Sequence, residues 1–140
     1  MKPKIIPFSE LKIGDKVVIN RKISRDDVQK FAKLTGDFNP LHLDEVYAAT
    51  TIFKKTIPPG MLLGSLFSTL VGMHLPGKNC LYLAQTLQFR NPAPMDGKIT
   101  ISGEIIEKVD SLKILIILTK IHDNENNLLI EGEARIKVLE

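Results

Sequence analysis

The stretch Met61–Leu75, MLLGSLFSTLVGMHL, decides the fold because it is apolar nearly all round. A helix with apolar residues on every side is typical of a helix that is buried in a protein core. Pro59 or Gly60 suits the first turn of such a helix, and Pro76–Gly77 is a stop signal directly after it. The sequence therefore predicts a buried helix over Met61–Leu75.

The residues before this helix predict one strand and two shorter helices. Lys16–Ile23 is typical of an opening strand. Ser24, followed three residues later by Asp27, forms a short capping box, which predicts a helix that ends at Gly36. Asp44 is expected to cap a second, short helix.

Period-two alternation replaces this pattern from Leu81 onward, which is typical of strands. The expected strands are Leu81–Phe89, Ile99–Val109, Ile114–Ile121 and Leu128–Leu139. Turn signals separate them, and the short connections imply an antiparallel meander. With the opening strand, this predicts an α+β fold in which a curved antiparallel sheet of about five strands wraps one buried helix. We expect a single domain over residues 1–140.

Composition excludes several classes of protein. The chain has 140 residues, of which 44% are hydrophobic and 25% charged, as in ordinary globular proteins. Its net charge of +3 is spread along the chain, which indicates no nucleic-acid partner but is compatible with a phosphate-bearing small molecule. No segment reaches the roughly 18 apolar residues of a membrane span, and Met1–Glu10 has no apolar leader. Cys80 is the only cysteine, so the cytoplasm is the expected location.

Asp37 and His42 are the first candidates for chemistry. Pro40 between them lacks an N–H and pushes the residue before it out of the helical region, so we expect a loop from Gly36 through His42. A loop can bring the two side chains onto one small volume, where an Asp and a His that share a water form an acid–base pair. Taken by itself, the spacing is more typical of a turn aspartate and a loop histidine.

The predicted start of the buried helix at Gly60 is the second candidate. Free N–H groups at a helix N-terminus carry partial positive charge and stabilise a developing oxyanion. Gly60 has no side chain to obstruct a substrate carbonyl. Most helix starts have no such role, but an acid–base loop followed by a Pro-Pro-Gly entry is more telling than either feature alone.

The remaining polar residues give weaker signals. Ser65 and Ser68 lie inside the predicted helix, where serine is usually a small packing residue, although Ser68 can still bond the loop or a substrate. No strand precedes Ser65, so it does not form a nucleophile elbow. His42, Asp44 and Glu45 are close in sequence, but H-E-x-x-H is absent, so no metal is expected. No nucleotide-binding motif occurs either.

Five motifs together resemble one known family. They are F-A-x-L-T-G-D-x-N-P-L-H-x-D over 31–44, A-A-T-T-x-F over 48–53, G-M-L-L-x-S-L-F-S over 60–68, L-P-G over 75–77, and Y-L-x-Q-x-L-x-F over 82–89. This pattern is similar to the R-specific enoyl-CoA hydratases, also called MaoC-like dehydratases. It covers most of the chain, and its first motif is specific. The most similar pattern is that of the small hydratases that supply (R)-3-hydroxyacyl-CoA for polyhydroxyalkanoate synthesis.

The resemblance implies a hot-dog fold, a long helix wrapped by the sheet, and a homodimer. The family's catalytic Asp and His fall on Asp37 and His42, and its oxyanion-hole N–H falls on Gly60. A serine near the active site of the family falls on Ser68.

Two further residues of the matched motifs, Asn39 and Ser65, are interpreted as supporting residues of the site. One position departs from the family. Many members have a histidine before the Gly-Met pair, where this chain has Pro59, which can donate no hydrogen bond.

The implied reaction is reversible syn addition of water to a trans-2-enoyl-CoA, giving an (R)-3-hydroxyacyl-CoA. No cofactor is expected, because coenzyme A is part of the substrate. Ordinary pKa values of about 3.9 for Asp and 6.5 for His favour His as the base, but a buried Asp with a raised pKa reverses this, so the base stays open. Two alternatives also stay open, an acyl-CoA thioesterase and a non-catalytic acyl-CoA-binding module. Candidates for binding the coenzyme phosphates are Lys54, Lys55, Lys78 and Arg90.

Overall fold

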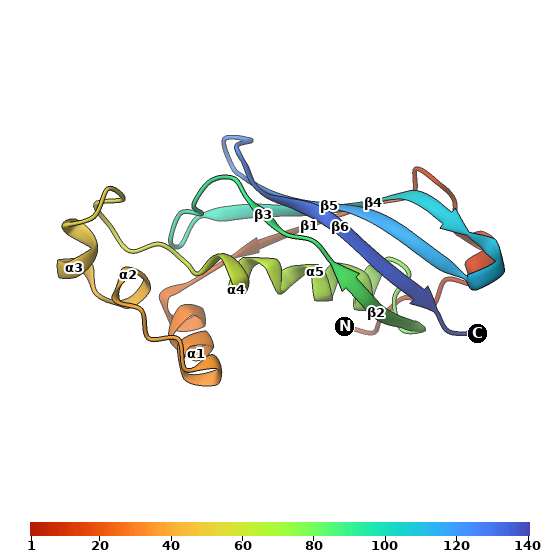
Figure 1. Cartoon of the computed structure of the whole chain (residues 1–140), viewed down its shortest axis with the longest axis horizontal. Coiled ribbons are helices and arrows are strands. Elements are labelled where there is room, and N and C mark those ends of the chain that lie inside the picture. Colours follow the sequence, from red (N-terminus) through yellow and green to blue (C-terminus); the bar gives the residue numbers. More distant parts are fainter.

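Six antiparallel strands form one curved sheet in the computed structural model, which describes residues 1–140 (Figure 1). The strand order is β1-β4-β5-β6-β2, and β3 also pairs with β6. The strands are β1 (Lys16–Lys22), β2 (Cys80–Gln85), β3 (Gln88–Phe89), β4 (Lys98–Val109), β5 (Ile114–Asp123) and β6 (Leu128–Val138). The predicted α+β fold is confirmed, with one strand more than expected because the predicted strand Leu81–Phe89 is divided into β2 and β3.

The division between β2 and β3 follows from a close approach to Gly132 on β6. A Cβ atom at Gly132 would overlap the carbonyl oxygen of Thr86, so only glycine fits there. The Thr86 N–H donates to the carbonyl of Glu133 at 3.0 Å, and the Thr86 hydroxyl accepts from the Glu133 N–H at 2.9 Å. The chain is therefore held against β6 at the point where the regular ladder is interrupted.

The core lies on the inner face of β4, β5 and β6. Ile101 on β4 pairs with Ile121 on β5, which in turn pairs with Ile130 on β6, and all three are buried. Removing a side chain of this size from water is worth about 1.5–3 kcal/mol. Phe67 and Leu70 from the central helical segment complete the same cluster.

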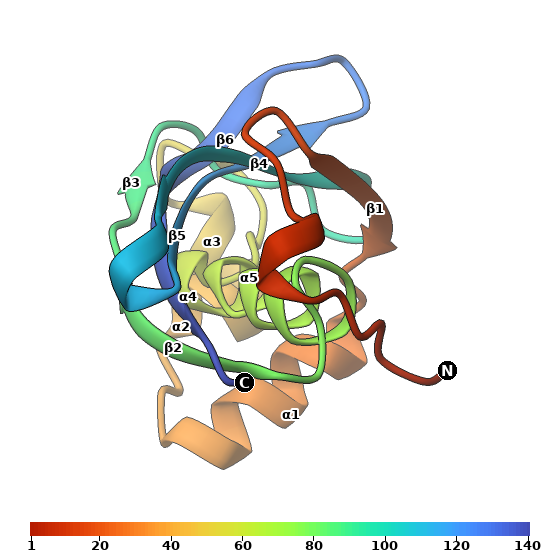
Figure 2. The same cartoon turned by 90° about the vertical axis from the view of Figure 1, so that its right-hand side faces the viewer.

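The central helical segment lies within the curve of the sheet (Figure 2). It comprises α4 (Gly60–Gly64), α5 (Leu66–Thr69) and a π-helical turn, η2 (Leu70–His74). The predicted helix is confirmed in extent but is not one regular α-helix. The interruption falls at Ser65, whose hydroxyl donates to the Leu62 carbonyl at 2.6 Å and competes with the backbone for it.

This helical segment is also not buried on every side, which corrects the expectation from its composition. Leu63, Phe67 and Leu70 face the core, whereas Met61 and Ser68 are exposed. The physical reason is that the sheet of one chain curves round only one side of the helix, so the opposite face stays open.

The predicted caps in the first half of the chain are confirmed. In α1 (Arg25–Thr35), the Ser24 hydroxyl accepts from the Asp27 N–H, and the Asp27 carboxylate accepts from the Ser24 N–H. Gly36 ends α1 with a φ of 81°, in the left-handed region that favours glycine. Asp44 caps α3 (Glu45–Ala49) by accepting two backbone N–H groups.

The expected loop from Gly36 through His42 is wrong in its second half. Pro40–Leu43 forms a one-turn helix, α2, with Asn39 as its cap. Proline suits the first position of a helix, because the missing N–H would have no partner there, and the Asn39 side chain accepts from the Leu41 N–H at 3.0 Å.

The three helices α1, α2 and α3 lie together at one end of the sheet, and the C-terminus lies near the other end (Figure 1). Two short 3-10 turns, η1 (Phe8–Glu10) and η3 (Asp110–Leu112), lie outside the central segment. None of the helices is both long and apolar enough to cross a membrane.

Candidate active site

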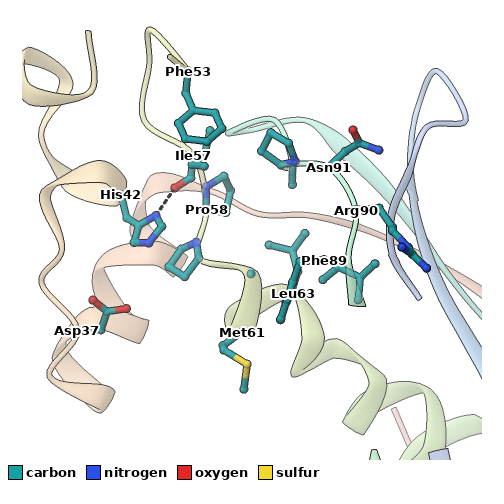
Figure 3. Close-up of a pocket in the computed structure, with 15 residues that line it drawn as sticks. Asp37, His42, Phe53, Ile57, Pro58, Met61, Leu63, Phe89, Arg90 and Asn91 are labelled. Carbon is teal, nitrogen blue, oxygen red and sulfur yellow. Dashed lines mark hydrogen bonds between the residues drawn. The ribbon is translucent and has the colours of Figure 1, made fainter. Parts of the chain in front are cut away.

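A pocket of about 450 Å3 opens where the helical end of the molecule meets the sheet (Figure 3). The ionisable side chains on its wall are Asp37, His42 and Arg90. A mostly apolar cavity with a few convergent polar groups is the usual form of a small-molecule site. The other lining residues are Phe53, Ile57, Pro58, Pro59, Gly60, Met61, Leu63, Phe89, Asn91, Pro92, Ala93 and Ile130.

Asp37 is held by its position directly after the C-cap of α1. Its N–H donates to the hydroxyl of Thr35 at 3.2 Å, and its Oδ1 accepts from the N–H of Asn39 at 3.1 Å. The other carboxylate oxygen, Oδ2, makes no hydrogen bond within the chain. Asp37 is exposed and therefore presents one uncommitted oxygen to a molecule in the pocket.

His42 is half-buried on α2, and its imidazole is fixed from one side. Its Nδ1 lies 2.7 Å from the carbonyl oxygen of Ile57, and a carbonyl can only accept. The neutral imidazole therefore carries its proton on Nδ1, which leaves the lone pair of Nε2 available. Figure 3 shows Asp37 and His42 on the same wall of the pocket, although they are five positions apart along the chain.

Gly60 begins α4 at the edge of the same pocket. The N–H groups of Leu62 and Leu63 donate to the Pro59 carbonyl and form the first hydrogen bonds of the helix. The N–H of Gly60 comes before them and has no acceptor within the helix. A Cβ at Gly60 would lie 2.7 Å from the ring of Phe89. Glycine is thus needed at this position, because any side chain would collide with the aromatic wall.

The remaining predicted site residues lie outside the pocket in the single chain. Asn39 caps α2, next to both Asp37 and His42 in sequence. Ser65 and Ser68 are exposed on the open face of the central helical segment, and Ser65 borders a second groove between α1 and α4.

One of the four basic candidates, Arg90, lines the pocket, whereas Lys54, Lys55 and Lys78 do not. Its guanidinium lies 2.8 Å from the carboxylate of Glu131 and also donates to the Gln88 side chain. The positive charge of Arg90 is therefore partly balanced by the Glu131 carboxylate on the neighbouring strand β6.

Sequence reasoning missed Asn91 and the two residues after it as pocket residues. The Asn91 amide donates to the Leu128 carbonyl at 2.7 Å, which anchors the chain that leaves β3. An Asn-Pro pair signals a turn, but this signal does not indicate which other segment the turn will face. The structure also contains no group of three His, Cys, Asp or Glu side chains arranged to hold a metal ion.

A six-stranded antiparallel sheet around a central helix defines a hot-dog protein, and here an Asp and a His line a pocket at the helix start. Residues 10–126 match the model of the MaoC like domain, and the chain belongs to this family.

Relatives extend the match over nearly the whole chain. The chain is 40% identical to an (R)-specific enoyl-CoA hydratase of Aeromonas caviae, over 91% of this chain and 96% of the relative. A solved (R)-hydratase from A. caviae, involved in PHA biosynthesis, superimposes with a TM-score of 0.89 at 40% identity, covering 91% and 97% of the two chains. An R-hydratase from Pseudomonas aeruginosa gives a TM-score of 0.93 at 37% identity, covering 99% and 88%.

Proposed function

We propose that this protein catalyses the reversible hydration of trans-2-enoyl-CoA to (R)-3-hydroxyacyl-CoA, as a hydro-lyase. The observation that carries the proposal is the shared pocket wall of Asp37 and His42, close to the start of α4 at Gly60. The likeness to R-specific enoyl-CoA hydratases supports the same reaction.

In the proposed mechanism, Asp37 and His42 hold one water molecule between them. The uncommitted Oδ2 of Asp37 accepts a hydrogen bond from this water, whose donating hydrogen stays on the oxygen. Nε2 of His42 removes the other hydrogen as a proton while the water oxygen bonds to C3. Because the Ile57 carbonyl keeps the proton on Nδ1, the geometry supports His42 as the base. The proton then passes to C2 from the same face, so that one water is added syn and both side chains return to their starting states.

The electrons of the double bond move into the thioester oxygen during this attack. We place that oxygen at the N–H of Gly60, where the helix start stabilises the negative charge. Removing a donor of this kind typically costs about 3–4 kcal/mol in the transition state.

Arg90 is the basic residue at the pocket that we assign to the coenzyme phosphates. The reaction requires no metal and no separate cofactor, since coenzyme A enters as part of the substrate.

A homodimer is part of the proposal. β2 is an edge strand with no partner on one side, and its Leu81 and Leu83 side chains are 52% and 47% exposed. Met61 on the open helix face is 60% exposed, and Ser65 and Ser68 lie on the same face. A free edge beside apolar side chains is covered in most proteins, and we propose that a second copy of this chain covers both surfaces.

This dimer can be tested by sedimentation of the purified protein. Leu83→Lys places a charge on the β2 edge and should convert a dimer into a monomer. A wild-type protein that sediments as a monomer at all concentrations contradicts this part of the proposal.

We also propose that the domain extends beyond the matched residues 10–126 to the whole of residues 1–140. β6 reaches beyond the match and lies between β5 and β2 in the sheet, and Ile5, before the match, bridges to Gly77.

The lone Cys80 forms no disulfide, which is consistent with the cytoplasm as the proposed location.

The reaction can be tested with crotonyl-CoA and the purified protein. Hydration consumes the conjugated double bond without releasing a thiol, whereas a thioesterase releases free coenzyme A. Loss of the double bond with no free thiol supports the proposal. Thiol release contradicts it in favour of a thioesterase, and binding without turnover contradicts it in favour of a binding module.

A further inference from the structure

A buried polar side chain that the proposed mechanism does not use lies directly before the pocket. Thr56 is 1% exposed, and its hydroxyl donates to Oε1 of Glu45 at 2.5 Å. Its N–H donates to Oε2 of the same carboxylate at 3.3 Å. Glu45 thus binds both the side chain and the backbone of Thr56, which fixes the orientation of this residue from two directions.

A third residue completes this contact. Arg25, the first residue of α1, lies 2.6 Å from Oε1 of Glu45, the first residue of α3. The hydrogen bonds from Thr56, and then that from Arg25, lower the pKa of Glu45. The carboxylate is therefore ionised at neutral pH, and it joins the starts of two helices to the segment that enters the pocket.

Ile57 connects this contact to His42. The Ile57 carbonyl accepts from Nδ1 of His42 at 2.7 Å, and the Ile57 N–H donates to the Leu41 carbonyl at 3.4 Å. Pro58 follows and restricts Ile57 to extended backbone angles. With Ile57 restricted in this way, the direction of its carbonyl depends on how the residue before it, Thr56, is held.

We propose that Glu45 and Thr56 are positioning residues, which hold the Ile57 carbonyl in place and thereby keep the proton of His42 on Nδ1. Neither residue lines the pocket, and both act on His42 through one peptide unit. The consequence for catalysis rests on the proposed function of His42 as base. The consequence for the tautomer does not, because it concerns only where the imidazole proton resides.

The tautomer is measured directly with long-range proton–nitrogen NMR spectra of the imidazole rings. The chain has only three histidines, so the His42 signals are assigned by their loss in His42→Ala. Neutral His42 in the wild-type protein is expected as the Nδ1–H form. Thr56→Val removes the hydroxyl at nearly constant volume and is expected to give a mixture of both tautomers, whereas Thr56→Ser keeps the hydroxyl and restores the wild-type spectrum.

Thr119→Val is the matched control. Thr119 is also fully buried, its hydroxyl donates to the Gly132 carbonyl at 3.0 Å, and it does not line the pocket. It loses a buried hydroxyl in the same way and should leave the His42 spectrum unchanged. A tautomer shift in this variant as large as that in Thr56→Val overturns the proposal, because it indicates a general loss of packing.

A second variant keeps the test valid if Thr56→Val does not fold. Glu45→Gln retains the shape of the side chain, and Glu45 is about half exposed, so the fold should tolerate it. The amide offers only one acceptor for the two Thr56 donors. Its matched control is Asp26→Asn, which disrupts another exposed ion pair, that of Asp26 with Lys30, without contact to the pocket.

The kinetic readout separates positioning from binding. Glu45→Gln and Thr56→Val should lower kcat for crotonyl-CoA by about tenfold to a hundredfold, which is typical of a misplaced catalytic group. KM should stay within about twofold, because the substrate contacts are unchanged. Thr56→Ser, Thr119→Val and Asp26→Asn should keep wild-type kcat.

The two readouts distinguish failure of this inference from failure of the proposed function. If Thr56→Val and Glu45→Gln keep both the Nδ1–H tautomer and wild-type kcat, the inference is wrong while the proposed function stands. If the tautomer shifts but the wild-type protein hydrates no enoyl-CoA, the positioning role stands and the proposed function is wrong.

Discussion

Nδ1 of His42 lies 2.7 Å from the carbonyl oxygen of Ile57, a residue fifteen positions further along the chain. This contact decides which nitrogen of the neutral ring faces the pocket as an acceptor. The proposed role of His42 as base therefore depends on the backbone of a segment that supplies neither of the proposed acid–base side chains. Asp37, by contrast, is held by its immediate neighbours Thr35 and Asn39.

Replacing either acid–base side chain should remove the activity and keep the fold. Asp37→Asn and His42→Ala are each expected to lower kcat for crotonyl-CoA hydration by at least about 10²- to 10⁴-fold, the usual contribution of an acid–base group. Asp37 is exposed and His42 only half-buried, so the free energy of unfolding should change by less than about 1 kcal/mol. Steady-state kinetics and urea unfolding check both parts. Either variant with most of its activity intact contradicts the assignment.

Gly60→Ala should be damaging because of the aromatic ring beside it. The new Cβ would lie 2.7 Å from Phe89, and overpacking of this kind typically costs about 1–3 kcal/mol of stability. Urea unfolding measures the loss, and the double variant Gly60→Ala/Phe89→Ala should recover part of it.

Gly72→Ala is the matched control for this variant on the same helical segment. A Cβ at Gly72 meets no atom within 4 Å, so the free energy of unfolding should stay constant or rise by up to about 1 kcal/mol. Equal losses in the two glycine variants would show that contact with Phe89 is not the cause.

Ser24→Ala tests the capping box that begins α1. It removes the acceptor of the Asp27 N–H and should lower the free energy of unfolding by about 0.5–2 kcal/mol, measured by urea unfolding. The kinetic constants should not change, since Ser24 is not part of the pocket.

Hydrogen bonds from Ser24 also lower the pKa of the Asp27 carboxylate. The stabilisation by this carboxylate is therefore present above its ordinary pKa of 3.8 and is lost as the pH falls through the lowered value.

Tyr82 should make the fold sensitive to alkali. Burial, followed by the nearby Cys80 thiolate, raises the pKa of Tyr82 from 10.0 to about 12. The unfolded chain therefore ionises first, and the contribution of Tyr82 to stability is complete below pH 10 and is lost as the pH rises towards about 12.

The comparison of wild type with Tyr82→Phe isolates this effect. Urea unfolding should show a steeper loss of stability above pH 10 in the wild type. In Tyr47→Phe, Tyr82 is the only remaining tyrosine, so its ionisation can be followed by absorbance. A Tyr82 that titrates at its ordinary value in this variant would contradict the prediction.

Local signals were sufficient for most of the secondary structure. Ser24 with Asp27, and Gly36, set the bounds of α1 because caps act within one helical turn. The alternation along Ile114–Ile121 and Leu128–Leu139 predicted β5 and β6, because one face of each strand is buried.

Features that depend on distant contacts were not predictable in this way. β2 ends near Gly132, where the Thr86 carbonyl closely approaches β6, and nothing near Thr86 in sequence indicates that approach. The Asp37 and His42 pair was predicted from one motif, but the contact of Glu45 with Thr56 joins residues eleven positions apart through tertiary structure. The helix at Pro40–Leu43 was not predicted, because proline breaks a helix in its interior but also suits its first position, which Pro40 occupies.

The configuration of the product formed from crotonyl-CoA tests the central claim most directly, namely that Asp37 and His42 add water to an enoyl-CoA from one defined face. Chiral analysis of the 3-hydroxybutyryl-CoA made by wild-type protein should show the R form, and Asp37→Asn should form almost none. An S product, or equal R product from Asp37→Asn, would contradict the account.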